Sequence, residues 1–183
     1  MNRKHGFTLV ELVIVLAIVT IGVLLATTNL QSWVYHYGAV DFRREILSRF
    51  HEARTRAMSS SLQHRLVIDL GTESATLQRG NAGTGSTTWV DALPRLQAPS
   101  GSAVSDIVFV PDPLMLSPVT AGTFAFIFNP NGEVLTQSDI GNPATISALT
   151  QAEVHLSAGT VADRATIDLF GWTSKARLLD GWV

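Results

Sequence analysis

An uninterrupted apolar run near the start of the chain limits what this sequence can fold into. Residues 7–26 contain a single ionisable side chain, Glu11. An α-helix rises about 1.5 Å per residue, so a helix of this length covers about 30 Å, which is the hydrocarbon thickness of a bilayer. We therefore predict a transmembrane helix over residues 7–27.

The residues before this run set its expected orientation. Arg3, Lys4 and His5 precede it, and the positive-inside rule keeps such an end in the cytoplasm and the rest of the chain outside the inner membrane. A cleaved secretory signal would have a shorter apolar region followed by a small-residue site, which residues 27–29 do not provide. An ordinary single-pass anchor is the other alternative.

Glu11 is the residue that neither alternative explains. A carboxylate at the centre of a membrane helix costs about 2.5–3.5 kcal/mol and marks a candidate functional residue. No Lys, Arg or His lies between Gly6 and Tyr35, so a cationic partner must come from another chain or from processing. Cleavage after Gly6 would free the amine of Phe7. We therefore expect Glu11 to act in assembly, by pairing with the Phe7 amine of a neighbouring subunit.

The segment Gly6-Phe7-Thr8-Leu9-Val10-Glu11-Leu12 resembles the type III signal of the type IV pilin superfamily. The resemblance implies a leader peptide at residues 1–6, which a prepilin peptidase removes between Gly6 and Phe7, and N-methylation of Phe7. It also implies that residues 7–27 pack in a filament with other pilins or pseudopilins. The subunit would wait in the inner membrane, with its globular domain in the periplasm, until an assembly platform extracts it.

Helical periodicity continues beyond the apolar run. No proline occurs between Phe7 and Leu93, and apolar residues recur at spacings of three and four through residues 42–58. We predict one helix from about residue 8 to about residue 59, whose periplasmic half occupies residues 28–61. Its polar face and the residues that follow are basic, and we interpret them as a solvated surface; contact with lipid, DNA or another subunit is the alternative. These basic residues are Arg43, Arg44, Arg49, Arg54, Arg56 and Arg65.

The remainder of the chain has the pattern of short strands. We expect a β-rich globular domain at residues 62–183, with a turn at residues 129–132 where Pro and Gly occupy favourable positions. The predicted fold class is α+β: a long N-terminal transmembrane helix continuing into an antiparallel β-sandwich, in a pilin-like lollipop shape. The predicted strands cover residues 65–70, 75–78, 107–110, 124–128, 133–135, 153–157, 165–169 and 176–179.

Residues 53–58, 66–68 and 126–132 resemble the GspH/FimT group, which contains H-type pseudopilins of the type II secretion system and minor pilins of type IV pili. The implied function is that of a structural subunit of a pseudopilus or pilus. Some FimT-like pilins bind DNA during transformation through a C-terminal segment, so a DNA-binding minor pilin is the alternative, with weak contacts at Lys175 and Arg177. Residues 66–183 contain five Lys/Arg against eleven Asp/Glu, which disfavours nucleic-acid binding.

The sequence contains no recognisable catalytic or metal-binding motif. The histidines show no ligand spacing, the serines at 59–61 lack a nucleophile elbow, and there is no cysteine. We therefore expect no enzymatic activity, no metal and no cofactor; a membrane-anchored exported enzyme is the remaining alternative. The histidines are His5, His36, His51, His64 and His155.

Overall fold

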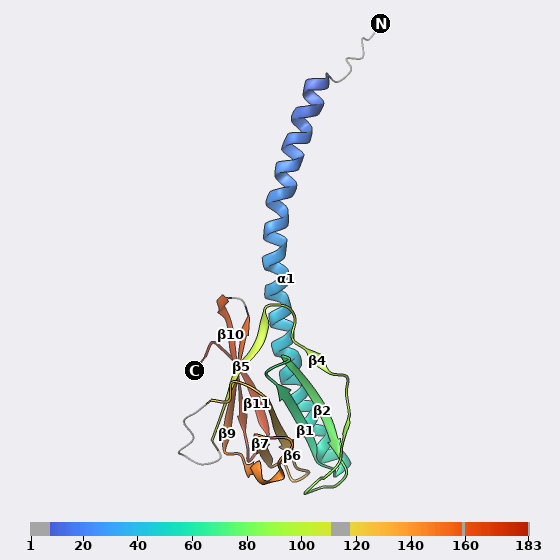
Figure 1. The fold of residues 1–183 in the computed structure, drawn as a ribbon, viewed down its shortest axis with the longest axis vertical. Coiled ribbons are helices and arrows are strands. Elements are labelled where there is room, and N and C mark those ends of the chain that lie inside the picture. The colour runs from blue at the N-terminus through green and yellow to red at the C-terminus, as the bar shows by residue number, and fades with distance from the viewer. Residues whose placement is uncertain (1–7, 111–117, 159, 183) are drawn as a thin grey trace.

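A single long helix and a β-rich head make up the chain (Figure 1). The computed structural model describes residues 8–110, 118–158 and 160–182, with side chains omitted at 25–35 and 160–163. Helix α1 runs from Leu9 to Ser60, which confirms the predicted helix to within a residue at each end. The helix ends at Ser61, whose φ of 56° lies in the left-handed region that terminates many helices.

One face of the second half of α1 is buried by the head. The side chains of Ala39, Phe42, Ile46, Phe50 and Ala53 have exposed fractions of 4% or less. Their spacing of three or four residues places them on one face of the helix. This half of α1 contacts strands of both sheets, so the helix provides the centre of the core.

The first half of α1 extends away from the head (Figure 1). Within the part of the chain that the structure describes, no helix combines the length and the apolarity that a membrane crossing requires. The predicted span at residues 7–27 reaches beyond that part, since Phe7 and the side chains of residues 25–27 lie outside the description.

The larger sheet is antiparallel and has the order β3-β2-β1-β6-β7-β8, with β4 also paired to β2. It is centred on β1 and β6, whose inward side chains reach the helix. Its strands are β1 (His64–Asp69), β2 (Ser74–Gly80), β3 (Trp89–Asp91), β4 (Leu96–Gln97), β6 (Thr123–Phe128), β7 (Val134–Gln137) and β8 (Ile146–Ala148).

The smaller sheet is also antiparallel and has the order β11-β10-β9-β5. In Figure 1 it lies to the left of α1, and the helix contacts strands of both sheets. Its strands are β5 (Ser102–Val110), β9 (Gln151–Ala158), β10 (Thr160–Phe170) and β11 (Lys175–Asp180). The predicted α+β class with an antiparallel β head is confirmed.

Aromatic side chains join the helix and the two sheets into one core. Phe50 of α1 makes edge contacts with Phe126 and Phe128 of β6, at centroid distances of 5.3 and 6.3 Å. Phe124 of β6 packs at 4.9 Å against Phe109 of β5. Such pairs add about 0.5–1.5 kcal/mol each beyond their buried area, so β6 holds both the helix and the smaller sheet.

The two sheets meet where the chain passes from β8 to β9. Leu149 N donates to Val134 O at 3.1 Å, Val134 N donates to Gly171 O at 2.8 Å, and Gly171 N donates to Thr150 O at 3.0 Å. A Cβ on Gly171 would lie 1.7 Å from Leu149 O, so only glycine fits this crossing point.

Each predicted strand has a counterpart in the structure, and three short strands were missed. These are β3, β4 and β8, each of two or three residues. Strand β5 also begins five residues before the predicted segment. The missed segments are partly exposed and carry no apolar alternation, so their pairing depends on neighbours that are distant in the sequence.

Candidate functional site

The N-terminal end of α1 is closed by Thr8 and Glu11. Glu11 N donates to Thr8 Oγ1 at 3.3 Å, and Glu11 Oε2 accepts from Thr8 N and from Thr8 Oγ1, both at 3.1 Å. This is a capping box, in which two backbone N–H groups at the helix start are satisfied reciprocally. The carboxylate also lies at the positive end of the helix dipole.

The capping box changes how Glu11 must be understood. From the sequence, we expected its partner to come from another chain or from a processed amine, but Thr8 of the same chain already donates hydrogen bonds to it. The signal was readable, because Thr8 and Glu11 have the spacing of a capping box before an apolar run. Gly6 and Phe7, the expected cleavage pair, lie outside the described residues.

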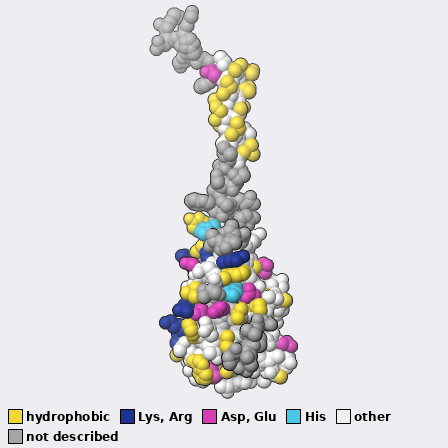
Figure 2. Space-filling model, turned by 90° about the vertical axis from the view of Figure 1, so that its left-hand side faces the viewer, with side chains coloured by type: hydrophobic (Ala, Val, Ile, Leu, Met, Phe, Trp, Pro, Cys, Tyr) yellow, Lys and Arg dark blue, Asp and Glu magenta, His cyan; other side chains and the backbone are white. Residues whose placement is uncertain are grey.

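Above the head, the stem presents apolar side chains on all sides. Figure 2 shows them on the face of the stem that is turned to the viewer. Each has an exposed fraction of 51% or more, and the head covers none of them. A contiguous apolar surface of this kind marks a site for lipid or for another protein. The residues are Leu9, Val10, Leu12, Val13, Ile14, Val15, Leu16, Ile18, Val19, Ile21, Val23 and Leu24.

The basic surface of the second half of α1 is only partly solvated. Arg49 and Arg56 form (i, i+4) ion pairs with Glu45 and Glu52, at 3.1 and 2.6 Å. The Arg56 side chain is 39% exposed, whereas that of Arg49 is 13% exposed. Arg43, however, is buried with an exposed fraction of 9%. For Arg43 the predicted solvated surface is wrong, because it lies four residues after Ala39 and three before Ile46, on the helix face that the head covers.

Arg65 is the second exception to the predicted solvated surface. It follows the end of the helix, lies on β1, and has an exposed fraction of 8%. Strand alternation places it on the sheet face opposite to Leu66 and Ile68. That face is covered by Trp89, whose ring lies 4.3 Å from the Arg65 guanidinium carbon.

Lys175 and Arg177, the two residues predicted as weak DNA contacts, both lie on β11 and are exposed. Arg177 is already paired: its Nε and Nη2 donate to Asp168 Oδ2 at 2.9 and 2.7 Å. The Asp168 side chain is 3% exposed, and Gln151 Nε2 also donates to it at 3.0 Å. Arg177 therefore neutralises a buried carboxylate of its own sheet.

His51, His64 and His155 lie apart from one another. His155 Nδ1 lies 2.7 Å from Asp106 Oδ1, and its ring stacks on Trp182 with 5.3 Å between centroids. His64 is buried, and burial lowers the pKa of its imidazole. Among the residues that the structure describes, no group of three His, Cys, Asp or Glu side chains could hold a metal ion.

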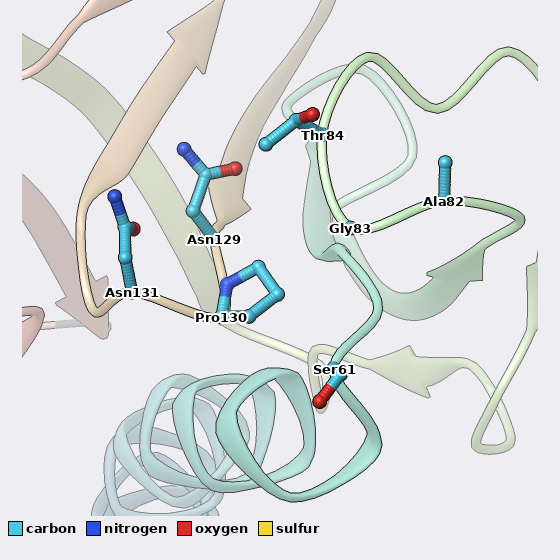
Figure 3. Close-up of a pocket in the computed structure, with 7 residues that line it drawn as sticks. All are labelled: Ser61, Ala82, Gly83, Thr84, Asn129, Pro130 and Asn131. Atoms are coloured by element: carbon cyan, nitrogen blue, oxygen red, sulfur yellow. The ribbon is translucent and has the colours of Figure 1, made fainter.

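A depression of about 440 Å³ lies at the far end of α1. Figure 3 shows that it is bordered by Ser61, by the loop at residues 82–84 and by the turn at residues 129–131. Its lining has amides and hydroxyls but no charged side chain. Asn129 Oδ1 already accepts a hydrogen bond from Gln63 Nε2 at 2.7 Å, so this acceptor of the depression is already in use.

The comparison with protein families decides the nature of the N-terminus. Residues 1–27 match the family model described as the prokaryotic N-terminal methylation motif. The chain begins with a prepilin-type methylation motif. This match confirms the predicted resemblance of that segment to the type IV pilin superfamily, and it leaves the head outside the matched residues.

Solved structures give a more distant likeness. The chain is similar to the minor pseudopilin EpsH from the type 2 secretion system of Vibrio cholerae, at 17% identity and a TM-score of 0.48, over 78% of this chain and 96% of that one. A second structure of the same pseudopilin gives 16% identity and a TM-score of 0.49, over 80% and 96%. No curated protein sequence matches the chain.

Proposed function

We propose that this protein is a structural subunit, a minor pilin or pseudopilin, of a type IV pilus or a type II secretion pseudopilus. The observation that carries the proposal is the methylation motif at residues 1–27, continuous with a helix whose apolar side chains are left uncovered by the head. A prepilin peptidase would cut between Gly6 and Phe7, and the new Phe7 amine would be methylated.

The proposed location follows from the same segment. Before assembly, residues 7–27 would anchor the subunit in the inner membrane, with the N-terminus in the cytoplasm and the head in the periplasm. The assembly platform would then transfer the helix from lipid to a bundle of stems of other pilins or pseudopilins. Both environments cover the apolar side chains of residues 9–24, so neither leaves them in water.

Glu11 is proposed to serve two partners in succession. In the isolated subunit its carboxylate accepts from Thr8 within the capping box. In the filament it would pair with the Phe7 amine of a neighbouring subunit. The two roles make different chemical demands: a cap needs only a hydrogen-bond acceptor, which Gln can provide at this position, whereas pairing with an amine in an apolar environment needs the negative charge.

The experiment compares Glu11→Gln with Thr8→Ala at the chromosomal locus of the producing bacterium. Glu11→Gln retains the acceptor and removes the charge, while Thr8→Ala removes the hydroxyl and retains the charge. We measure the amount of subunit in isolated filaments, and the N-terminal residue by mass spectrometry. We expect Glu11→Gln to be processed normally but to lose assembly by about tenfold or more, since about 1.4 kcal/mol corresponds to a factor of ten.

Thr8→Ala serves as the matched control. Loss of a capping hydroxyl costs about 0.5–2 kcal/mol of helix stability, and in a helix packed among others we expect assembly to stay within about twofold of the wild type. Normal assembly of Glu11→Gln together with poor assembly of Thr8→Ala would show that Glu11 acts only as a cap. A mature protein that retains residues 1–6, or that is cut at another bond, would refute the filament-subunit proposal.

A further inference from the structure

Arg65 is a buried cation with an incomplete set of partners. Its Nε donates to Gln78 Oε1 at 2.7 Å, and its guanidinium lies over the ring of Trp89. Its Nη1 is 3.5 Å from Gln137 Oε1, at the limit of a hydrogen bond. Gln78 in turn donates to Asp91 Oδ1 at 2.9 Å. Asp91 is therefore linked to Arg65 only through Gln78 and does not pair with it directly.

Two other arginines of the head differ from Arg65 in this respect. Arg95 and Arg177 both form ion pairs, with Asp69 and Asp168. Among the described residues, no Asp or Glu oxygen lies within 4.0 Å of Arg65. Burial lowers the pKa of Arg65 to about 10, which still leaves the group protonated at neutral pH. A buried charge without a counter-charge is costly, and such charges are normally paired.

Arg65 lines a pocket of about 430 Å³. The lining also contains the loop at residues 85–87, Trp89, Gln137 and Gly141, together with an apolar wall made of Ile140, Pro143 and Ile146. The pocket therefore combines one cation with hydroxyl and amide groups and with an apolar wall. Its volume lies within the range of small-molecule sites, about 300–1,000 Å³.

We propose that this pocket binds a carboxylate carried on a short apolar group, with Arg65 as its counter-ion. A guanidinium presents parallel N–H groups that match the two oxygens of a carboxylate, and the apolar wall would accept the carbon chain behind it. The carboxylate could belong to a free organic acid or to an acidic side chain of another polypeptide. This proposal depends only on Arg65 and the other residues that line the pocket, and it is independent of the filament proposal.

The test uses the full chain labelled with ¹⁵N in a non-ionic detergent. Three probes are titrated at pH 7: sodium isovalerate as a free acid, the capped tripeptide Ac-Gly-Glu-Gly-NH₂ as a side-chain carboxylate, and inorganic phosphate. The readout is the NMR shift of the backbone amides of Ser86 and Thr87 and of the indole N–H of Trp89. We expect saturable shifts with at least one of the two carboxylates; the one with the lower Kd identifies the source of the ligand.

Variants establish whether Arg65 is responsible. Arg65→Gln should raise the Kd by about 10- to 100-fold, as expected for loss of a charge-assisted bidentate contact. Arg79→Gln is the matched control, because Arg79 lies on the neighbouring strand β2 but is exposed; it should leave the Kd unchanged within about twofold. If Arg65→Gln does not fold, Arg65→Lys is used instead. Lysine keeps the charge but lacks the planar guanidinium that can contact both carboxylate oxygens, so this variant should raise the Kd by about tenfold.

Three results would overturn the proposal. The first is the absence of saturable shifts with both carboxylates. The second is binding that persists unchanged in Arg65→Gln or, where that variant does not fold, in Arg65→Lys. The third is phosphate binding that is as tight as that of the better carboxylate, which would show an unspecific anion site.

Discussion

Gly171 occupies the point where the two sheets join, and its replacement by alanine tests whether that junction holds the head together. A carbon and a carbonyl oxygen normally approach to about 3.3–3.6 Å, but the added Cβ would lie 1.7 Å from Leu149 O and 2.4 Å from Leu149 C. The backbone at Leu149 would have to move by about 1.6 Å or more to relieve the contact.

That movement would disturb the hydrogen bonds that cross the junction. Leu149 N and Thr150 O take part in two of them, with Val134 O and Gly171 N as partners. Loss of each bond costs about 0.5–1.5 kcal/mol, and overpacking in a rigid core costs about 1–3 kcal/mol. We therefore expect Gly171→Ala to lower the free energy of unfolding by about 2–6 kcal/mol.

The assay is urea unfolding of the full chain in a non-ionic detergent, followed by tryptophan fluorescence. Gly141→Ala is the matched control, because a Cβ there would lie 3.4 Å from the nearest atom, Asp139 Oδ1; it should change the stability by less than about 0.5 kcal/mol. If the free energy of unfolding of Gly171→Ala were within about 0.5 kcal/mol of that of the wild type, the close approach of the two sheets described above would be incorrect.

Two further changes test the core and a buried histidine. Phe50→Ala removes the side chain that contacts Phe126 and Phe128, and it should lower the free energy of unfolding by about 3–5 kcal/mol in the same assay; a loss below about 1 kcal/mol would contradict the central position of Phe50. Burial lowers the pKa of His64, and the nearby charges of Arg56 and Arg79 act in the same direction, while the contact with the Leu62 carbonyl opposes them. The unfolded state therefore binds the proton more readily than the folded state. Titration of His64 should not reduce the free energy of unfolding above about pH 6.5, and should reduce it as the pH falls from there toward the lowered pKa. His64→Gln should reduce this slope, measured by urea unfolding between pH 5 and 8, and an identical slope in both proteins would exclude His64 as its source.

Much of the fold could be predicted because apolar patterns report burial directly. The spacing of Phe42, Ile46 and Phe50 predicted the buried face of α1, and the apolar segment at residues 124–128 predicted β6. Strands β3 and β8 could not be predicted, because they are short and partly exposed and exist only by pairing with edges formed by other parts of the chain.

The candidate site was predictable only where local spacing determines the chemistry. The segment from Gly6 to Glu11 indicated the methylation motif, and the Thr8–Glu11 spacing would have indicated the capping box had it been considered. Arg65 was grouped with the basic residues of the helix because the sequence does not show which face of β1 Trp89 covers. The contacts of Arg177 with Asp168 also depend on the register between β10 and β11, which residue type alone does not determine.

The continuity of α1 determines how the subunit would respond to a mechanical load. Its buried side chains run from Ala39 to Ala57, a distance of about 27 Å along the helix axis. A pull on the N-terminal end would act parallel to this row, so all of its contacts would have to slide at once instead of separating one after another. Traction along the stem should therefore move the head as a unit, whereas a sideways force on the helix would open the core from its upper end.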